Sequence, residues 1–290
     1  MKNIIMSKNT LKFLCVFLLS FFSVFCFAER QAKDLTSLLK IKGELTQGSA
    51  IVGQLPVGTK LLINDKVIKT TSAGDFLIGF GRDDELRQSL YLMTESGEEF
   101  VDILVLTKRE YKLQEVNGVP HKTVSPNKEN LKRIKSENIL VKRAREAVSD
   151  HTYFLESFIA PMQSTITGVY GSQRVYNGVP KRPHYGVDYA GQVGAAVYAP
   201  ASGIVTLVHP DMFYSGGTLI LDHGYGVSSS FLHLSEILVK EGQEIKQGDL
   251  IAKVGKGGRA TGPHLDWRMN WFDVRIDPLK VIEINKDTAQ

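Results

Sequence analysis

The sequence predicts a mainly β protein built from two small β domains that a single helix connects. Between residues 41 and 113, and again after residue 162, short apolar stretches alternate with Gly-containing turns, which is typical of antiparallel strands. Residues 125–150 instead carry apolar side chains at helical spacing. With 290 residues, 43% of them hydrophobic and 23% charged, the chain is long enough for two globular domains.

The first 28 residues have the three parts of a secretory signal. Lys2, Lys8 and Lys12 precede an uncharged apolar run from residue 13 to residue 27, and Ala28 follows it. The run is shorter than a typical membrane span. We therefore expect residues 1–28 to be a signal peptide, cleaved after Ala28, and the mature protein to be exported to the periplasm or cell envelope. A retained N-terminal anchor is the alternative.

Cleavage would change the cysteine content and the charge of the protein. Both cysteines, Cys15 and Cys26, lie in the signal, so the mature chain would contain no disulfide. Loss of three lysines and no acids lowers the formal net charge from +4 to +1. A chain this close to neutral has no basic surplus for nucleic acid, and nothing in it indicates membrane binding once the signal is removed.

Residues 29–120 are expected to form a small β-sandwich-like domain. The apolar stretches 60–63, 76–78 and 90–93 each border Asn, Asp, Ser or Gly residues that favour turns. This part has no histidine cluster, no paired catalytic groups and no phosphate-binding loop. We interpret it as a binding or positioning module.

Residues 121–153 are expected to form a helical linker. Ser125-Pro126 offers an N-cap followed by proline at the first helical position. One face carries apolar side chains, namely Leu131, Ile134, Val141, Ala144 and Val148. The other face is rich in Lys and Arg, which predicts a solvated surface, with contact to an anionic envelope polymer as the alternative.

Residues 154–290 are expected to form a second β domain. Strands are predicted at 203–208, 217–221, 227–233 and 250–254, with Gly-containing turns between them and no helix after residue 162. Such strands favour an antiparallel sheet that carries a site in a groove on one face.

The candidate site residues of this domain are histidines and aspartates at even spacings. His184 and Asp188 lie in an extended segment, where a separation of four residues places both side chains on one face, and the same holds for His264 and Asp266. His233 ends a predicted strand. Imidazole and carboxylate groups that converge in this way can bind zinc. By contrast, His209 and His223 lie next to turns and are expected to have structural or surface roles.

These motifs resemble those of the LytM/lysostaphin-type zinc peptidases, which cleave peptide cross-links of bacterial peptidoglycan. The resemblance covers roughly residues 158–279 and includes His-x-x-x-Asp at 184–188, the single His233 and Thr-Gly-Pro-His at 261–264. It also includes the segments 199–203 and 239–248. The resemblance implies one zinc ion per chain, bound by His184, Asp188 and residue 266. It also implies that His233 and His264 contact the bound water and the developing oxyanion, and leaves open which of them is the general base.

Asp266 departs from the family pattern, which usually has histidine at this position. Aspartate binds zinc at roughly 2.0–2.2 Å, so the position can still supply a ligand. Two carboxylates would make the first shell formally neutral instead of +1, and the metal a weaker Lewis acid. We nevertheless expect a working site.

The sequence thus favours an exported zinc endopeptidase that hydrolyses stem-peptide cross-links of peptidoglycan. Candidate substrate contacts are Tyr185, Tyr189, Tyr214 and Arg268. One alternative is a catalytically degenerate member of the family that regulates or activates cell-wall amidases. A second is an envelope-binding module whose function lies in the N-terminal domain. A protein regulator of the enzyme is left open as a further partner.

Overall fold

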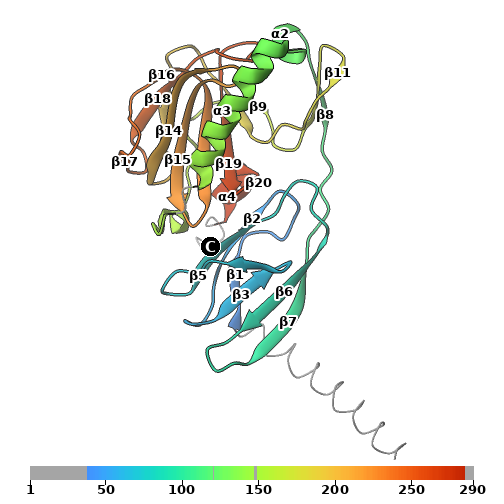
Figure 1. Cartoon of the computed structure of the whole chain (residues 1–290), viewed down its shortest axis with the longest axis vertical. Helices are drawn as coiled ribbons and strands as arrows, with labels where there is room; N and C mark the ends of the chain where they lie inside the picture. Colours follow the sequence, from blue (N-terminus) through green and yellow to red (C-terminus); the bar gives the residue numbers. More distant parts are fainter. Residues whose placement is uncertain (1–37, 120, 147–148, 285–290) are drawn as a thin grey trace, which may run out of the picture.

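The computed structural model describes residues 38–119, 121–146 and 149–284, and the predicted mainly β class is confirmed. Two β modules follow one another along the long axis of the molecule (Figure 1). The predicted signal peptide lies outside the described residues. Within the described ranges, no helix combines the length and the hydropathy that a membrane crossing requires.

The N-terminal module consists of two antiparallel sheets. One has the order β1-β2-β5, from β1 (Lys40–Lys42), β2 (Ala50–Gln54) and β5 (Asp75–Gly79). The other has the order β4-β3-β6-β7, from β3 (Lys60–Ile63), β4 (Lys66–Ile68), β6 (Arg87–Met93) and β7 (Glu99–Val105). Side chains of both sheets, such as Ile51, Phe76, Leu61 and Leu92, share one buried cluster. The predicted sandwich-like arrangement is therefore present.

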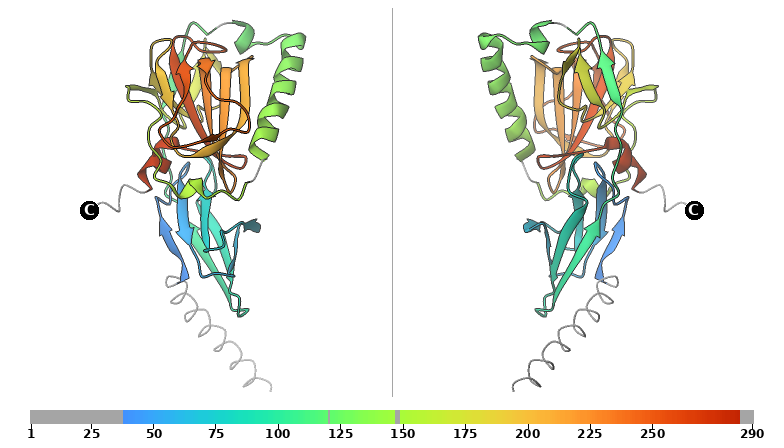
Figure 2. Two further views of the ribbon diagram at one scale, coloured as in Figure 1. Left: turned by 90° about the vertical axis from the view of Figure 1, so that its left-hand side faces the viewer. Right: turned by 90° about the vertical axis from the view of Figure 1, so that its right-hand side faces the viewer.

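The connection between the modules runs along the C-terminal module before it enters its sheet. Strand β8 (Leu113–Val116) pairs in parallel with β10 (Gln173–Tyr176), and β11 (Val179–Pro180) completes this small sheet. After the short helix α2 (His121–Val124), helix α3 (Lys128–Glu146) runs back beside the large sheet (Figure 2). The helix begins later than the expected Ser125 because Asn127 Oδ1 accepts the backbone N–H of Asn130 at 2.9 Å, which is an N-cap interaction.

Helix α3 packs on the sheet through its C-terminal half. Val141 and Ala144 contact a small apolar cluster on strands β14 and β15, formed by Leu207, Met212 and Ile220. The predicted apolar stripe is wrong at its start, because Leu131 is 52% exposed. A buried glutamate takes its place at the interface, since Glu137 accepts a hydrogen bond from the backbone N of Phe213 at 2.8 Å.

The C-terminal module is organised around a ten-stranded sheet. Its main path is β17-β14-β15-β16-β19-β12-β9, with β13, β18 and β20 attached, and its strand pairs are antiparallel. The strands are β9 (Ile166–Gly168), β12 (Val187–Ala190), β13 (Ala196–Tyr198), β14 (Gly203–Met212), β15 (Gly216–Gly224), β16 (Val227–Ile237), β17 (Glu244–Ile245), β18 (Leu250–Val254), β19 (His264–Trp271) and β20 (Val274–Ile276).

One short helix, α4 (Pro278–Glu283), occurs in the region after residue 162 where none was predicted, and a 3₁₀ turn, η1 (Tyr153–Leu155), precedes that region. The side chain of Asp277 accepts the backbone N–H of Leu279 at 3.0 Å, and Pro278 occupies the first helical position. An N-cap side chain followed by proline at the first helical position is the same pattern that predicted a helix start at Ser125-Pro126.

The two modules share one hydrophobic core. Gly79 of β5 packs so closely on β19 and β20 that an added Cβ would lie 2.8 Å from Trp271 Cβ and 2.8 Å from Ile276 Cγ2. An ion pair between Arg109 and Asp277, at 3.0 Å, supports the same interface. The modules are therefore held as one packed body, and the N-terminal module rests on one end of the large sheet.

His223 has the structural role expected of it, and this role makes the stability depend on pH. The side chain is fully buried, with Nδ1 2.7 Å from the Ser202 carbonyl and Nε2 2.8 Å from Ser229 Oγ. Burial lowers the pKa of His223 to about 4. Because the unfolded chain binds the proton near pH 6.5, this histidine should cost stability as the pH falls from about 6.5 to about 4, by about 3 kcal/mol in total.

Urea unfolding of the wild type and His223→Gln between pH 4 and pH 8 tests this expectation. The variant should lack the part of the pH dependence that corresponds to one proton taken up on unfolding between pH 4 and 6.5. Other titrating groups are common to both proteins and cancel in the difference. Parallel curves over the whole range would contradict the role assigned to His223.

Candidate metal centre

Strands β12 and β19 bring the predicted ligands together. They pair so that Asp188 and Asp266 are directly opposite each other, which places both carboxylates on one face of the sheet. His184 precedes β12, and its backbone is held by hydrogen bonds with Ser172 at 2.8 Å and Gly171 at 2.7 Å. The local spacing and the pairing of the two strands together direct the imidazole toward the two carboxylates.

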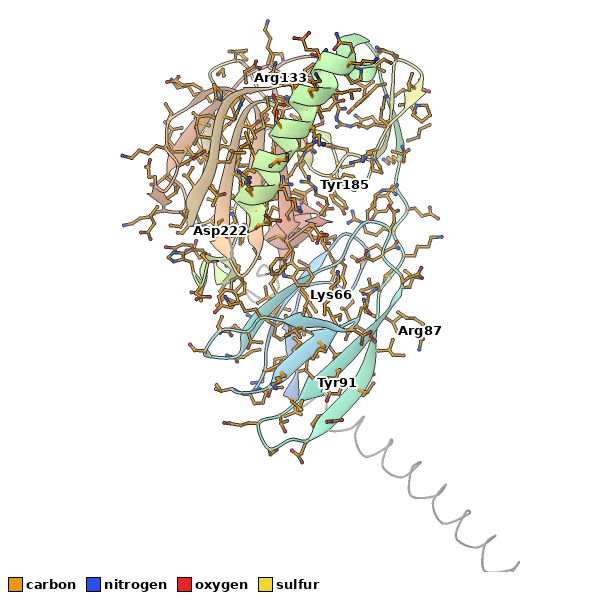
Figure 3. All side chains as sticks on the ribbon, viewed as in Figure 1. Lys66, Arg87, Tyr91, Arg133, Tyr185 and Asp222 are labelled. Carbon is orange, nitrogen blue, oxygen red and sulfur yellow. The ribbon has the colours of Figure 1, made fainter. Side chains whose placement is uncertain are left out.

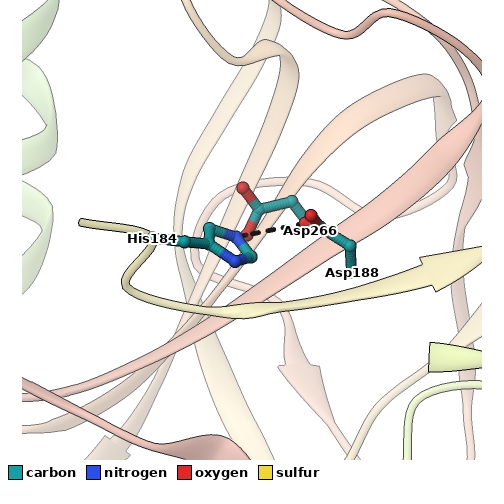
Figure 4. A group of neighbouring side chains, drawn as sticks. All are labelled: His184, Asp188 and Asp266. Carbon is teal, nitrogen blue, oxygen red and sulfur yellow. Dashed lines mark ion pairs between the residues drawn. The ribbon is translucent and has the colours of Figure 1, made fainter. Parts of the chain in front are cut away.

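The three side chains converge on one point. His184 Nε2 lies 3.1 Å from Asp188 Oδ1 and 3.4 Å from Asp266 Oδ1 (Figure 4). One ligand atom from each residue can be chosen so that all three lie within 4.8 Å of one another. All three residues are buried, yet His184 Nε2 and Asp188 Oδ1 make no hydrogen bond of acceptable geometry. Buried polar atoms without hydrogen bonds that face one another in this way fit a metal ion with three protein ligands.

An arginine holds the second oxygen of each carboxylate. Arg268 Nε lies 2.9 Å from Asp266 Oδ1 and 3.1 Å from Oδ2, and its Nη2 lies 2.5 Å from Oδ2. Arg174 Nη2 hydrogen-bonds Asp188 Oδ2. Both aspartates therefore direct Oδ1 toward His184 and accept from a guanidinium group through Oδ2, and Asp266 Oδ1 also accepts from Arg268 Nε. Such contacts orient the ligands of a metal site.

The electrostatics of the centre favour a cation. Burial opposes ionisation of Asp266, but Arg268 and His184 outweigh it and hold the pKa of Asp266 well below its usual value. Burial also disfavours a charged His184, yet Asp188 and Asp266 raise the pKa of this imidazole. Two ionised carboxylates that attract a proton to a buried imidazole would attract a divalent ion at the same position.

His233 lies where strand β16 changes partners. The strand pairs with β19 as far as Leu232 and with β18 from Leu234 onward. His233 adopts a positive φ of 65° at this point, and its Nδ1 lies 2.8 Å from the Gly257 carbonyl. Because a carbonyl only accepts, Nδ1 carries the proton and Nε2 keeps a lone pair. Burial lowers the pKa of His233 to about 4, so the imidazole is neutral near pH 7.

His264 lies next to His233 and close to the Asp188 carboxylate. Its ring centroid is 4.7 Å from that of His233, and its Nε2 is 3.8 Å from Asp188 Oδ1. Its Nδ1 lies 2.9 Å from the Gly262 carbonyl, and its side chain remains 18% exposed. The structure thus brings together His184, Asp188, His233, His264 and Asp266, which are the five residues selected from the sequence.

The four predicted substrate contacts have different positions. Tyr189 is 3% exposed and belongs to the hydrophobic core, so its predicted substrate contact is wrong. Alternation along β12 places its side chain on the face opposite to Asp188. Arg268 lies beside the centre, but its guanidinium is bonded to Asp266. Tyr185 and Tyr214 are partly exposed, and their substrate contacts stay predictions; Figure 3 labels Tyr185.

Sequence reasoning missed the arginine partners of the two carboxylates. Arg268 lies two residues after Asp266 on the same strand face, and this spacing was a usable signal. Arg174 comes from β10, outside the large sheet, and pairs with Asp188 through the tertiary fold alone.

Comparison with known proteins agrees with this geometry. Residues 182–278 match the model of peptidase family M23. Among curated proteins, the peptidoglycan DD-endopeptidase ShyB of Vibrio cholerae is 41% identical over 100 residues, which are 34% of this chain and 23% of that protein. The DD-carboxypeptidase/endopeptidase Mpg of Neisseria meningitidis is 35% identical over 100 residues, again 34% of this chain and 23% of that protein. The match therefore spans about a quarter of these relatives.

A solved structure extends the similarity to most of the chain. A putative peptidase M23 from Pseudomonas aeruginosa superposes with a TM-score of 0.64 at 27% identity, over 82% of this chain and 95% of that one. The matched segment 182–278 contains His184, Asp188, His233, His264 and Asp266. The resemblance predicted from the motifs is confirmed by the match of residues 182–278 to the model of peptidase family M23.

Proposed function

We propose that this chain is an exported zinc endopeptidase that hydrolyses peptide cross-links of peptidoglycan in the periplasm or cell envelope. The observation that supports this most directly is the convergence of His184, Asp188 and Asp266, with two further imidazoles on the same side. The names of the matched relatives, a peptidoglycan DD-endopeptidase and a DD-carboxypeptidase/endopeptidase, support the substrate class. In this proposal residues 154–290 carry the peptidase, 29–120 position it, and 121–153 connect the two.

The donor set suits a zinc ion. His184, Asp188 and Asp266 would hold the ion through one imidazole and two carboxylates. Three protein ligands would leave a coordination position of the zinc free for water or substrate. Bound zinc would acidify a water molecule and polarise the scissile carbonyl group. The chain's own contribution to this chemistry comes from His233 and His264.

During hydrolysis, one of the two histidines would accept the proton of the water molecule and the other would stabilise the negative charge on the carbonyl oxygen. His233 is neutral and has a lone pair on Nε2, so it suits the acceptor of the water proton. His264 Nε2 lies 3.8 Å from Asp188 Oδ1, and with its ring protonated on both nitrogens His264 would donate an N–H to the carbonyl oxygen as negative charge develops on it. Because Gly257 and Gly262 hold the Nδ1 atoms, both rings keep Nε2 available for these tasks.

Arg268 changes the expected effect of aspartate at position 266. Its ion pair with Asp266 places a positive charge next to the ligand, so the net charge around the centre is closer to that of a site with histidine at 266. The weaker Lewis acid predicted from two carboxylates is therefore partly offset. The compensating charge of Arg268 supports the active enzyme over the degenerate regulator.

One observation favours the regulator as a second candidate. Arg268 and Arg174 already neutralise the two carboxylates, so a centre without metal is electrostatically tolerable. A protein of this kind would keep the fold and bind cell-wall components or amidases without hydrolysing a bond.

Metal content and digestion of sacculi distinguish the two candidates. Protein that begins at Glu29 is expected to purify with about one zinc ion per chain and to release soluble peptides from sacculi. A strong chelator should abolish the release, and added zinc should restore it. Protein that stays metal-free and inactive after zinc loading would contradict the endopeptidase and support the regulator.

A further inference from the structure

Helix α3 lies on the same face of the sheet as the metal centre. Along β19, Asp266, Arg268 and Asn270 alternate onto one face, and Ser230 of β16 is paired with Arg268 on that face. Arg145, near the end of α3, reaches this row, with Nη2 3.0 Å from Ser230 Oγ. The connecting helix therefore brings a cationic side chain next to the strand that carries a predicted metal ligand.

Three arginines lie near one another there, and one of them, Arg268, is paired with the carboxylate of Asp266. Arg145 lies near Arg268 and Arg275. Arg275 is on β20, where it is paired with Asn270 of β19, and it donates a hydrogen bond to Asn270 Oδ1 at 2.8 Å. The carboxylate of Asp266 is bonded to Arg268. Within the described ranges, neither Arg145 nor Arg275 makes an ion pair.

The cluster has an excess of positive charge. Burial lowers the pKa of Arg145, and the charges of Arg275 and Arg268 lower it further. Burial followed by Arg268 also lowers the pKa of Arg275 to about 10. Partly buried guanidinium groups that repel one another are normally balanced by an anion.

Two buried atoms beside these arginines have no hydrogen-bond partner among the described residues. One is Arg145 Nε, and the other is the hydroxyl oxygen of Ser228, a residue that is only 4% exposed. Ser228 is paired with Asn270 and lies on the same face as Ser230. Native proteins satisfy almost all buried polar groups. These two donors therefore mark a position that suits the oxygen atoms of a bound anion.

We propose that Arg145 and Arg275 form a subsite for a carboxylate of the substrate peptide, next to the metal centre. This inference rests on the peptidase function proposed above. A carboxylate matches the planar donor arrangement of guanidinium groups. Arg268 is two residues from Asp266, which is about 7 Å along a strand. A carboxylate held beside Arg268 therefore belongs to a residue close to the cleaved bond, and α3 contributes to substrate choice.

Binding of a stem tetrapeptide tests the subsite without catalysis. The probes are the tetrapeptide with free carboxylates and the same peptide with its carboxylates converted to amides, titrated calorimetrically into zinc-loaded protein. The wild type should bind the free acid about tenfold to hundredfold more tightly than the amide, as expected for charge-assisted hydrogen bonds. Equal affinity of the wild type for the two peptides would overturn the proposal.

Variants on α3 assign the effect to its residue. Arg145→Gln should lose about tenfold or more of the affinity for the free acid and none for the amide. Arg145→Lys should recover part of it, and Arg143→Gln, which alters an exposed arginine of the same helix, should behave as wild type. The melting temperature of Arg145→Gln should be no lower than that of wild type, because a repelling charge is removed. A variant that melts lower and keeps its preference for the acid would indicate a merely structural arginine.

Kinetics separate this proposal from the proposed function. With a cross-linked stem-peptide dimer, Arg145→Gln should raise KM about tenfold and leave kcat and zinc content unchanged. An unchanged KM would contradict the subsite. If the wild type hydrolyses no dimer, the endopeptidase proposal fails, whereas the difference in affinity between acid and amide still decides the role of Arg145.

Discussion

Asp266→Ala protein is expected to bind zinc more than about a hundredfold more weakly than wild type and to lose hydrolysis of sacculi. The reason is that only His184 and Asp188 would remain as ligands, and loss of even an outer contact to a ligand costs about 10- to 100-fold in affinity. Competition with a chromogenic chelator measures the affinity. Thr261→Ala, close to the site but outside the ligand set, is the control and should retain its zinc.

Asp266→His tests the departure from the family pattern, and Arg268 decides its result. With histidine at 266 the guanidinium of Arg268 loses its ion pair, and a buried charge left unpaired costs about 3–5 kcal/mol. We therefore expect Asp266→His to be less stable than wild type, and the double variant Asp266→His/Arg268→Gln to bind zinc more tightly than Asp266→His. If wild type and Asp266→Ala are equally free of zinc while the double variant gains both zinc and activity, Asp266 is not a functional ligand.

His233→Asn protein is expected to keep its zinc and to lose about 10²- to 10⁴-fold in kcat. This is the usual contribution of a positioned general base. Asparagine is the better replacement because it tolerates the positive φ of 65° at this position, whereas alanine would add backbone strain. Single-turnover digestion of a cross-linked dimer gives the rate, and metal analysis gives the zinc content.

His209→Asn is the matched control for this variant. His209 lies on β14, outside the set of residues that surround the centre, and accepts the backbone N–H of Asp211. Its replacement should leave the rate unchanged. A His233→Asn enzyme that digests sacculi at the wild-type rate would exclude the role of proton acceptor.

Much of the site follows from local spacing. An extended chain places side chains two or four residues apart on one face, and this is enough to pair His184 with Asp188 and His264 with Asp266. Gly-rich turns between short apolar stretches likewise predict antiparallel strands throughout both modules. These rules depend on the backbone alone, so the mainly β class and the five residues of the centre could be selected without coordinates.

Local spacing does not decide which face of a strand is buried or which distant element covers it. It could not place Tyr189 in the core, because both faces of β12 carry buried side chains. It also could not bring Arg174 of β10 to Asp188 or Arg145 of α3 to Ser230, since these contacts join elements that pack only in the folded chain. The sequence by itself was enough to select the residues that converge at the centre. The tertiary structure decided which arginines surround them, because charge pairing at this site depends on long-range packing.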